Sequence, residues 1–366
     1  MKIAGFAAEN MASSHLRVRQ WIDALKKRGH VAEFHGDTIM DLSTIDAKLA
    51  GCDAVIYGRT HDINRVVALQ AARKVHGFKL IVDTDDLVDN IPAHNFASRA
   101  FNNSTGLIRI ANGQYRDADA VTCSTQYLAD HTRKITDAVY YVPNVVDTNL
   151  WNGVRTRNKE ARHAGDIRIY WGGGGGHYDD LLIVKDALLR IVREHANVKL
   201  VFSNFVPDWA ASLPWNRVFF LPLVPFELYP RILTHLCIDI GLAPLIDHPF
   251  NQAKSHVKWL DYAMAGIPGV YQDIDAYDAV VERESSAHQT GLLATTPEHW
   301  YEQISALVAD AALRQRIAIN ARDEVTTKWT VEQHDAAYER MLQRITRPPV
   351  VVSRLVEGEA IACQTL

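Results

Sequence analysis

The chain of 366 residues is long enough for two domains of ordinary size. With 48% hydrophobic and 22% charged residues, its composition is that of a soluble globular protein. A net charge of -4 gives no general attraction to nucleic acid or to an anionic membrane, and no apolar run approaches the ~20 residues that cross a bilayer.

Buried strands and helices alternate through the first part of the chain. One helix is predicted where apolar residues recur on a single face before Gly29; these are Val18, Trp21, Ile22 and Leu25. Strands are predicted at Lys2–Ala7, Val31–Phe34, Ala54–Tyr57, Leu80–Val82, Ala120–Cys123 and Val139–Val142, helices at Ile63–His76 and Phe96–Asp117, and a polar loop at Glu9–Ser14.

The same alternation restarts near residue 167. Strands are predicted at Ile167–Trp171, Val198–Phe202, Val218–Phe220, Ile238–Leu242 and Val270–Tyr271, and helices around Leu181–Ile191, His256–Ala265, Trp300–Val308 and Val331–Ile345. Because this alternation builds parallel sheets with helices on both faces, two series predict an α/β chain of two Rossmann-like, doubly wound domains. The strand-end loops of the two sheets would then face a common cleft.

The segment 152–166 is polar and poor in large apolar residues, as a linker between domains is. We therefore predict an N-terminal domain at 1–150 and a C-terminal domain at 151–330. A helix at 331–347 can cross back to the first domain, and the tail at 348–366 fits no clear element.

The N-terminal residues Met1–Ala8 lack the basic region and long apolar run of a signal peptide. The four cysteines are widely scattered, with no CxxC pair. Both features predict a cytoplasmic protein with reduced, packed thiols.

Five consecutive glycines, Gly172–Gly176, lie between a predicted strand and a predicted helix. Backbone N–H groups in such a loop can hold a diphosphate at the positive end of the helix, with His177 as a further donor. We therefore assign Gly173, Gly174, Gly175 and Gly176 to a nucleotide site. The alternative is a flexible loop that happens to be rich in glycine. In that case His177 simply caps the loop and Asp180 caps the helix.

A second candidate site precedes the helix predicted at His256–Ala265. A cation and a hydroxyl group at a helix N-terminus, Lys254 and Ser255, form a phosphate site, and Asn251 lies in the same loop. Asp261, about two turns into the helix, can accept hydrogen bonds from two ribose hydroxyls. The alternative is a surface helix with solvated charges.

A third candidate site is the run Asp83–Asp86, which directly follows a predicted strand. These carboxylates could hold a divalent metal, hold sugar hydroxyls, or cap the strand end. The loop Glu9–Ser14 faces the same cleft, and Arg17 behind it can reach a diphosphate or an acidic acceptor, whereas Arg19 is expected to be solvated.

Several segments together resemble the retaining GT-B glycosyltransferases, the group that includes many polysaccharide and lipid-sugar enzymes. Val142–Asp147 resembles the "PNGVD" segment of that family, and Phe250–Pro268 resembles its donor-site helix ending in "EAMAxGxPVV". Gly291–Ala294 resembles "GLLV", while Trp171–Leu181 and Asp83–Leu87 resemble the "WxGxxxHxxDL" and "DxDDxxF" patterns of a subgroup.

This resemblance implies that Asp261 holds the ribose of a nucleotide. The first glutamate of the family's paired-glutamate motif would fall at Ala253 and is missing, so Lys254 takes a phosphate or sugar contact instead. Gly269 also departs from the usual valine.

On this basis we expect a glycosyltransferase that moves a sugar from a UDP- or GDP-sugar to an acceptor hydroxyl, with retention. No cofactor and no metal are expected. The expected catalytic residues are Lys254, His177 and Asp85. The residues expected to bind the nucleotide sugar are Gly173, Gly174, Gly175, Gly176, Asn251, Ser255, Lys258 and Asp261. The residues expected on the acceptor or phosphate side are Asn10, Ser14, Arg17 and Asp86.

Two other functions remain open at this point. One is a sugar-nucleotide epimerase of the same fold, and the other is a non-catalytic protein that binds a sugar nucleotide. The acceptor (a glycan, a lipid-linked sugar, a small molecule or a modified DNA base) and the oligomeric state are not readable.

Overall fold

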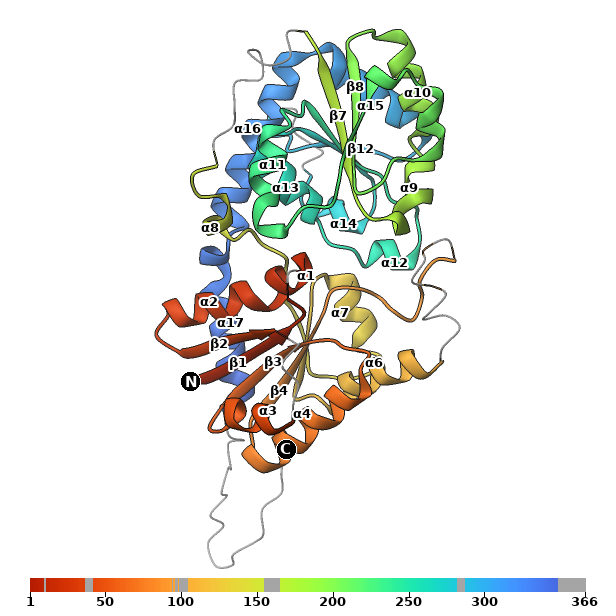
Figure 1. Cartoon of the computed structure of the whole chain (residues 1–366). Helices are drawn as coiled ribbons and strands as arrows, with labels where there is room; N and C mark the ends of the chain where they lie inside the picture. Colours follow the sequence, from red (N-terminus) through yellow and green to blue (C-terminus); the bar gives the residue numbers. More distant parts are fainter. Residues whose placement is uncertain are drawn as a thin grey trace, which may run out of the picture.

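The computed structural model describes residues 1–9, 11–36, 42–93, 95, 98, 105–154, 165–281 and 287–347. Two parallel sheets of six strands each form two layered α/β units, one above the other in Figure 1. This is the architecture that the alternating sequence pattern predicts.

The first sheet has the strand order β2-β1-β3-β4-β5-β6. Its strands are β1 (Lys2–Ala7), β2 (Val31–Gly36), β3 (Ala54–Gly58), β4 (Lys79–Thr84), β5 (Ala120–Cys123) and β6 (Val139–Tyr141). The helices between them are α1 (Ala12–Ser14), α2 (Gln20–Lys27), α3 (Leu42–Leu49), α4 (Ile63–His76), α6 (Thr105–Asp117), α7 (Gln126–Thr132) and α8 (Thr148–Trp151), and a π-helical turn, η1 (His15–Arg19), joins α1 to α2.

The second sheet has the order β12-β11-β10-β7-β8-β9. Its strands are β7 (Ile167–Gly172), β8 (Val198–Ser203), β9 (Val218–Leu221), β10 (Ile240–Ala243), β11 (Gly269–Gln272) and β12 (Leu292–Ala294). Its helices are α9 (Tyr178–Leu182), α10 (Lys185–Glu194), α11 (Tyr229–His235), α12 (Pro249–Gln252), α13 (Val257–Ala265), α14 (Asp275–Asp278), α15 (Pro297–Ala309) and α16 (Ala311–Lys328), followed by α17 (Val331–Thr346).

Several strand ends differ from the prediction by one or two residues, and two helical segments need a larger correction. The loop predicted at Glu9–Ser14 is already helical from Ala12, and the helix predicted around Leu181–Ile191 is divided into α9 and α10. The division falls at Val184, which is fully buried and has no side-chain capping bond. The strand at Ala120–Cys123 and the helix at Ile63–His76 have the predicted bounds.

Helix α17 returns from the second half of the chain to the first sheet, as Figure 1 shows. The ring of Tyr338 stacks on that of Trp21 with their centroids 4.5 Å apart, and Glu339 pairs with Arg28 and His30. The last helix therefore ties the two units together.

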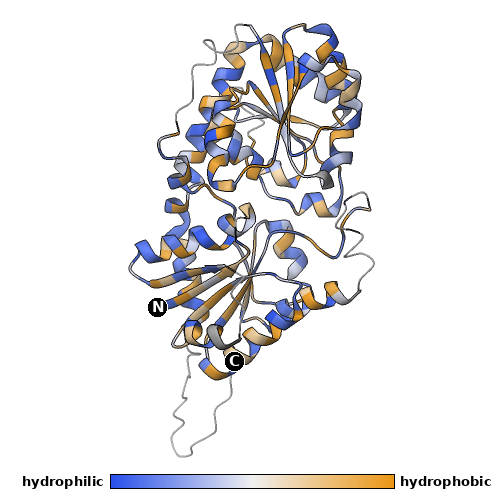
Figure 2. Cartoon of the chain, in the orientation of Figure 1, coloured by the Kyte–Doolittle hydropathy of each residue, from blue (hydrophilic) through white to orange (hydrophobic). Residues whose placement is uncertain are grey.

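Both sheets carry apolar side chains, and polar residues concentrate on the outer faces of the helices (Figure 2). The core of the first unit also contains two residues from the second half of the chain, Phe250 and Ala253. Short helix α12 therefore enters the first unit, at the junction between the two sheets.

Two large tyrosines of the second unit, Tyr262 on α13 and Tyr271 on β11, occupy space that neighbouring glycines leave open. A Cβ atom at Gly241 would lie 2.5 Å from the ring of Tyr262, and one at Gly269 would lie 2.1 Å from the hydroxyl of Tyr271. The glycine at position 269, a departure from the family pattern, thus has a packing cause.

Candidate active site

A cavity of about 240 Å³ lies between the two units. Strand ends and helix starts of both sheets form its walls, because the carboxyl ends of parallel strands share one edge. The structure brings together in this cavity several residues chosen from the sequence, which are Arg17, Asp85 and Asp86 from the first unit and His177, Lys254, Ser255 and Lys258 from the second.

Lys254 and Asp86 join the two walls. The Lys254 Nζ atom lies 2.7 Å from Oδ1 of Asp86 and 4.3 Å from the centre of the Phe250 ring. Although burial opposes it, the charge of Lys254 holds the pKa of Asp86 below its usual value. The cation expected to meet a phosphate is therefore held, in this structure, by a carboxylate of the opposite unit.

Asp85 lies beside this pair and faces a second cavity as well. Burial and the charge of Asp86 raise the pKa of Asp85 to about 6, although the charge of Arg59 opposes the shift. The shift reflects the burial of Asp85 next to a second carboxylate.

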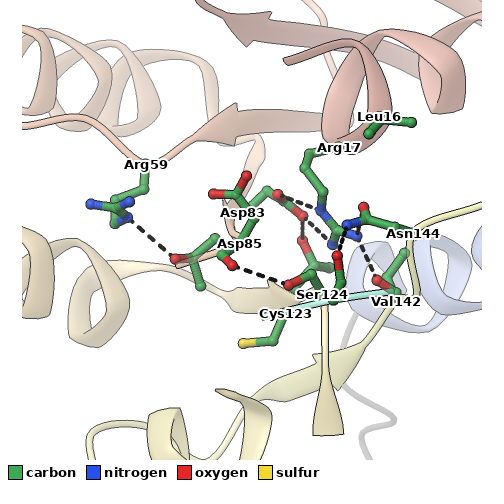
Figure 3. A network of polar contacts seen from close by, with 12 residues as sticks. Leu16, Arg17, Arg59, Asp83, Asp85, Cys123, Ser124, Val142 and Asn144 are labelled. Carbon is green, nitrogen blue, oxygen red and sulfur yellow. Dashed lines mark hydrogen bonds and ion pairs between the residues drawn. The ribbon is translucent and has the colours of Figure 1, made fainter. Parts of the chain in front are cut away.

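Arg17 is almost fully buried and is held by partners within the protein (Figure 3). It donates to both carboxylate oxygens of Asp83, at 3.0 and 2.9 Å, to the carbonyl of Val142 and to the side chain of Asn144. These contacts correct the expectation that Arg17 reaches a diphosphate or an acidic acceptor, because most of its N–H groups are already used. Asp83 is likewise a structural partner, since it also accepts a hydrogen bond from Thr122.

The same network continues into the second unit. The amide of Asn144 donates to the hydroxyl of Ser255 at 2.6 Å, and Thr125 donates to the carbonyl of Ala253 at 3.0 Å. Ala253 is fully buried between the units. The position that carries a glutamate in the resembled family is here a packed interface residue.

The glycine run forms the end of β7 and a 3-10 turn, η2 (Gly175–His177). A Cβ atom at Gly173 would lie 2.6 Å from the ring of Trp171, and one at Gly176 would lie 3.0 Å from the side chain of Asn95. Among the described residues, nothing lies within 4 Å of the Cβ position at Gly174. Packing therefore explains part of the run, whereas the space beside Gly174 is open.

Asn251 was expected to contact the nucleotide, but its side chain is buried and engaged. Its amide donates to Oδ1 of Asp180 at 3.1 Å and to the carbonyl of Ile246 at 3.0 Å. The structure therefore corrects the assignment of Asn251. Its hydrogen bonds to Asp180 and Ile246 hold the segment that precedes Lys254 in place.

Lys258 and Asp261 both lie on α13, where their charges influence each other. Burial lowers the pKa of Lys258 to about 8 and raises the pKa of Asp261 to about 7, and in both groups the charge of a neighbouring residue opposes the shift. Asp261 does not line the cavity between the units. Its charge adds to burial in raising the pKa of Tyr170 and of Tyr229, neither of which lines that cavity.

A second cavity, of about 300 Å³, opens at the ends of β1, β3 and β4. Ser14 lines it, as do Arg59 and Thr60, which the sequence reading missed. Arg59 donates to Nε2 of His61 at 2.7 Å, so that imidazole is neutral, and burial with the charge of Arg59 lowers the pKa of His61 to about 4. The one signal for Arg59 was its place just after a strand. Asn10, also predicted here, lies outside the described residues.

Two absences concern the membrane and metal ions. Within the described ranges, no helix is long and apolar enough to cross a membrane. In the same ranges, no group of three or more His, Cys, Asp and Glu side chains is arranged to hold a metal ion.

No family model matches the sequence, and no curated protein is detectably similar to it. Solved structures do match the fold. A sucrose-phosphate synthase from Thermosynechococcus elongatus has a TM-score of 0.67 at 13% identity, over 94% of this chain and 99% of that one. HepE of Anabaena, in complex with UDP-glucose, has a TM-score of 0.68 at 13% identity, over 94% and 100%. A glycosyltransferase from Rickettsia africae has a TM-score of 0.63 at 13% identity, over 94% and 98%.

The chain therefore has the GT-B fold that these solved structures share. At these identities the likeness concerns the fold.

Proposed function

We propose that this chain is a glycosyltransferase that transfers a sugar from a UDP- or GDP-sugar to an acceptor hydroxyl, with retention and without a metal ion. The observation that carries the proposal is the cavity between the units, where Lys254 and Lys258 face Asp85 and Asp86. A compact pair of cations in a cavity is what a departing diphosphate needs.

In this proposal the diphosphate lies along the second unit, at Gly174 and the two lysines. Phosphate oxygens would replace Asp86 as the partner of Lys254, so the charge that now joins the units would meet the leaving group. When the bond between the anomeric carbon and the phosphate oxygen breaks, negative charge grows on the diphosphate, and Lys254 stabilises it.

The acceptor would enter the cavity formed by Ser14, Arg59 and Thr60. Asp85 belongs to the walls of both cavities, so it can hold the acceptor hydroxyl where the two substrates meet. The UDP-glucose complex of HepE supports the choice of donor class, since that protein has the same fold. Retention is supported by the sequence resemblance to retaining enzymes.

The proposal is tested by incubating the protein with UDP-glucose, UDP-galactose, UDP-N-acetylglucosamine and GDP-mannose in turn and analysing the products. Release of nucleoside diphosphate supports sugar transfer or donor hydrolysis. An epimerised nucleotide sugar without release would identify an epimerase, and binding without any product would identify a non-catalytic protein.

A further inference from the structure

Asp180 is a buried carboxylate for which the sequence suggested only a helix-capping role. Its Oδ1 atom accepts hydrogen bonds from the backbone N–H of Ile246, at 2.8 Å, and from the amide of Asn251, at 3.1 Å. Its Oδ2 atom lies 2.7 Å from Nδ1 of His177. The carboxylate is 1% exposed and acts as an acceptor on both oxygens.

These contacts fix the orientation and the tautomer of His177. A carboxylate that only accepts hydrogen bonds requires a proton on Nδ1 of His177, so the lone pair of the neutral ring lies on Nε2. Burial lowers the pKa of His177, although the bond to Asp180 opposes the shift, which keeps the ring neutral near pH 7. Nε2 has no hydrogen-bond partner among the described residues, and it is not among the polar atoms that are buried without a partner. It is therefore free to meet a ligand in the cavity that His177 lines.

We propose that Asp180 is a positioning residue that holds His177 in its Nδ1–H form, so that Nε2 accepts a hydrogen bond from a hydroxyl group of the donor sugar. This inference rests on the proposed function, and it deepens it by assigning one residue to sugar selection. The residues concerned come from the glycine loop and α9, on the donor side of the cavity.

The tautomer also decides between two ligands. The lone pair on Nε2 repels phosphate oxygens, which are acceptors as well, whereas a sugar hydroxyl can donate to it. The early expectation that His177 donates to a diphosphate is thereby replaced. The phosphate remains with Lys254 and Lys258, and His177 distinguishes a nucleotide sugar from the bare nucleotide.

Asp180→Asn is a sharp test because the two oxygens of Asp180 have separate partners. In the variant, Oδ1 can still accept from Ile246 and Asn251, while the new NH₂ group faces Nδ1 of His177. The imidazole must then accept at Nδ1 and carry its proton on Nε2. Asp186→Asn, an exposed position in the first turn of α10, removes the same charge without touching His177 and is the matched control.

Two measurements follow on the full chain. Nitrogen-15 NMR of the histidines should show the Nδ1–H tautomer for His177 in the wild type and in Asp186→Asn, and the Nε2–H tautomer in Asp180→Asn. Titration calorimetry should show that Asp180→Asn weakens the tightest of the four nucleotide sugars about 10- to 100-fold, with the affinity for its nucleoside diphosphate unchanged within about twofold.

The inference is overturned if wild-type His177 carries its proton on Nε2, or if Asp180→Asn weakens nucleotide and nucleotide sugar equally. If Asp180→Asn fails to fold, two variants of His177 replace it. His177→Gln can still accept a hydrogen bond, whereas His177→Phe cannot. Equal affinity of these two variants for the nucleotide sugar also overturns the inference. Failure of the wild type to bind any nucleotide would refute the proposed function, and the sugar contact with it, whereas the NMR result bears on the tautomer alone.

Discussion

Lys254 of the second unit and Asp86 of the first form an ion pair of 2.7 Å across the cavity that separates the two sheets. Both side chains are partly exposed, so the pair can open without breaking the core. A diphosphate that binds to Lys254 would meet the carboxylate of Asp86 at the same ammonium group, and the ion pair therefore competes with the donor.

Asp86→Asn should tighten the binding of UDP or GDP about 2- to 10-fold, because it frees Lys254 and removes a negative charge facing the phosphate. Titration calorimetry of both nucleotides measures the effect. Weaker binding by the variant would mean that Asp86 itself contacts the ligand, contrary to this competition.

The Arg17–Asp83 pair is predicted to be structural. Arg17→Ala leaves a buried carboxylate without its bidentate partner and should lower the free energy of unfolding by about 3–5 kcal/mol. Urea denaturation provides the measurement, and Arg19→Ala, at an exposed position two residues further on, should change stability by no more than ~0.5 kcal/mol. Equal, small effects in both variants would show that the buried network contributes nothing to stability.

Asp261 predicts a pH dependence of stability. Its folded pKa of about 7 lies above the unfolded value of about 4, so the folded state binds the proton more tightly. Its contribution to stability is complete below about pH 4 and is lost as the pH rises through about 7. The wild type should therefore lose free energy of unfolding as the pH rises over this range, and Asp261→Asn should lose less. Because one unit of pKa corresponds to about 1.4 kcal/mol and the pKa of Asp261 shifts by more than one unit, the difference between the two proteins should exceed about 1.4 kcal/mol.

Denaturant unfolding of wild type and Asp261→Asn at several pH values between 4 and 8 checks this slope. Superimposable pH profiles would show that Asp261 titrates normally.

The same variant should bind nucleotide and nucleotide sugar equally weakly if Asp261 holds the ribose, since ribose contacts belong to both ligands.

We predict that the transfer reaction does not need a divalent metal ion. Donor turnover should survive excess EDTA, because the proposal assigns the charge of the diphosphate to Lys254 and Lys258. Complete loss of turnover that Mn²⁺ restores would instead assign a metal to the carboxylates Asp83 and Asp85.

The strands could be predicted because buried parallel strands are short, continuous apolar runs, as at Ala120–Cys123. Helix α16 was missed because its buried residues, Ile317, Ala321 and Val325, form one narrow stripe among charged neighbours. The cavity could be located from residues that follow strands. The role of Arg17 could not, because Asp83, Val142 and Asn144 lie 66 or more residues away in sequence. The role of Asp180 could not either, because two of its three partners, Ile246 and Asn251, are equally distant, although His177 is only three residues away.

The most direct test of the leaving-group site is the release of nucleoside diphosphate from a UDP- or GDP-sugar by the wild type and by Lys254→Ala. The account predicts turnover by the wild type and a kcat reduced about 100-fold in the variant, with little change in KM, since Lys254 acts on charge that develops as the bond breaks. Wild-type kcat in Lys254→Ala, in an enzyme that does turn over, would contradict the assignment of the leaving-group site. No binding and no turnover of any UDP- or GDP-sugar by the wild type would contradict the account as a whole.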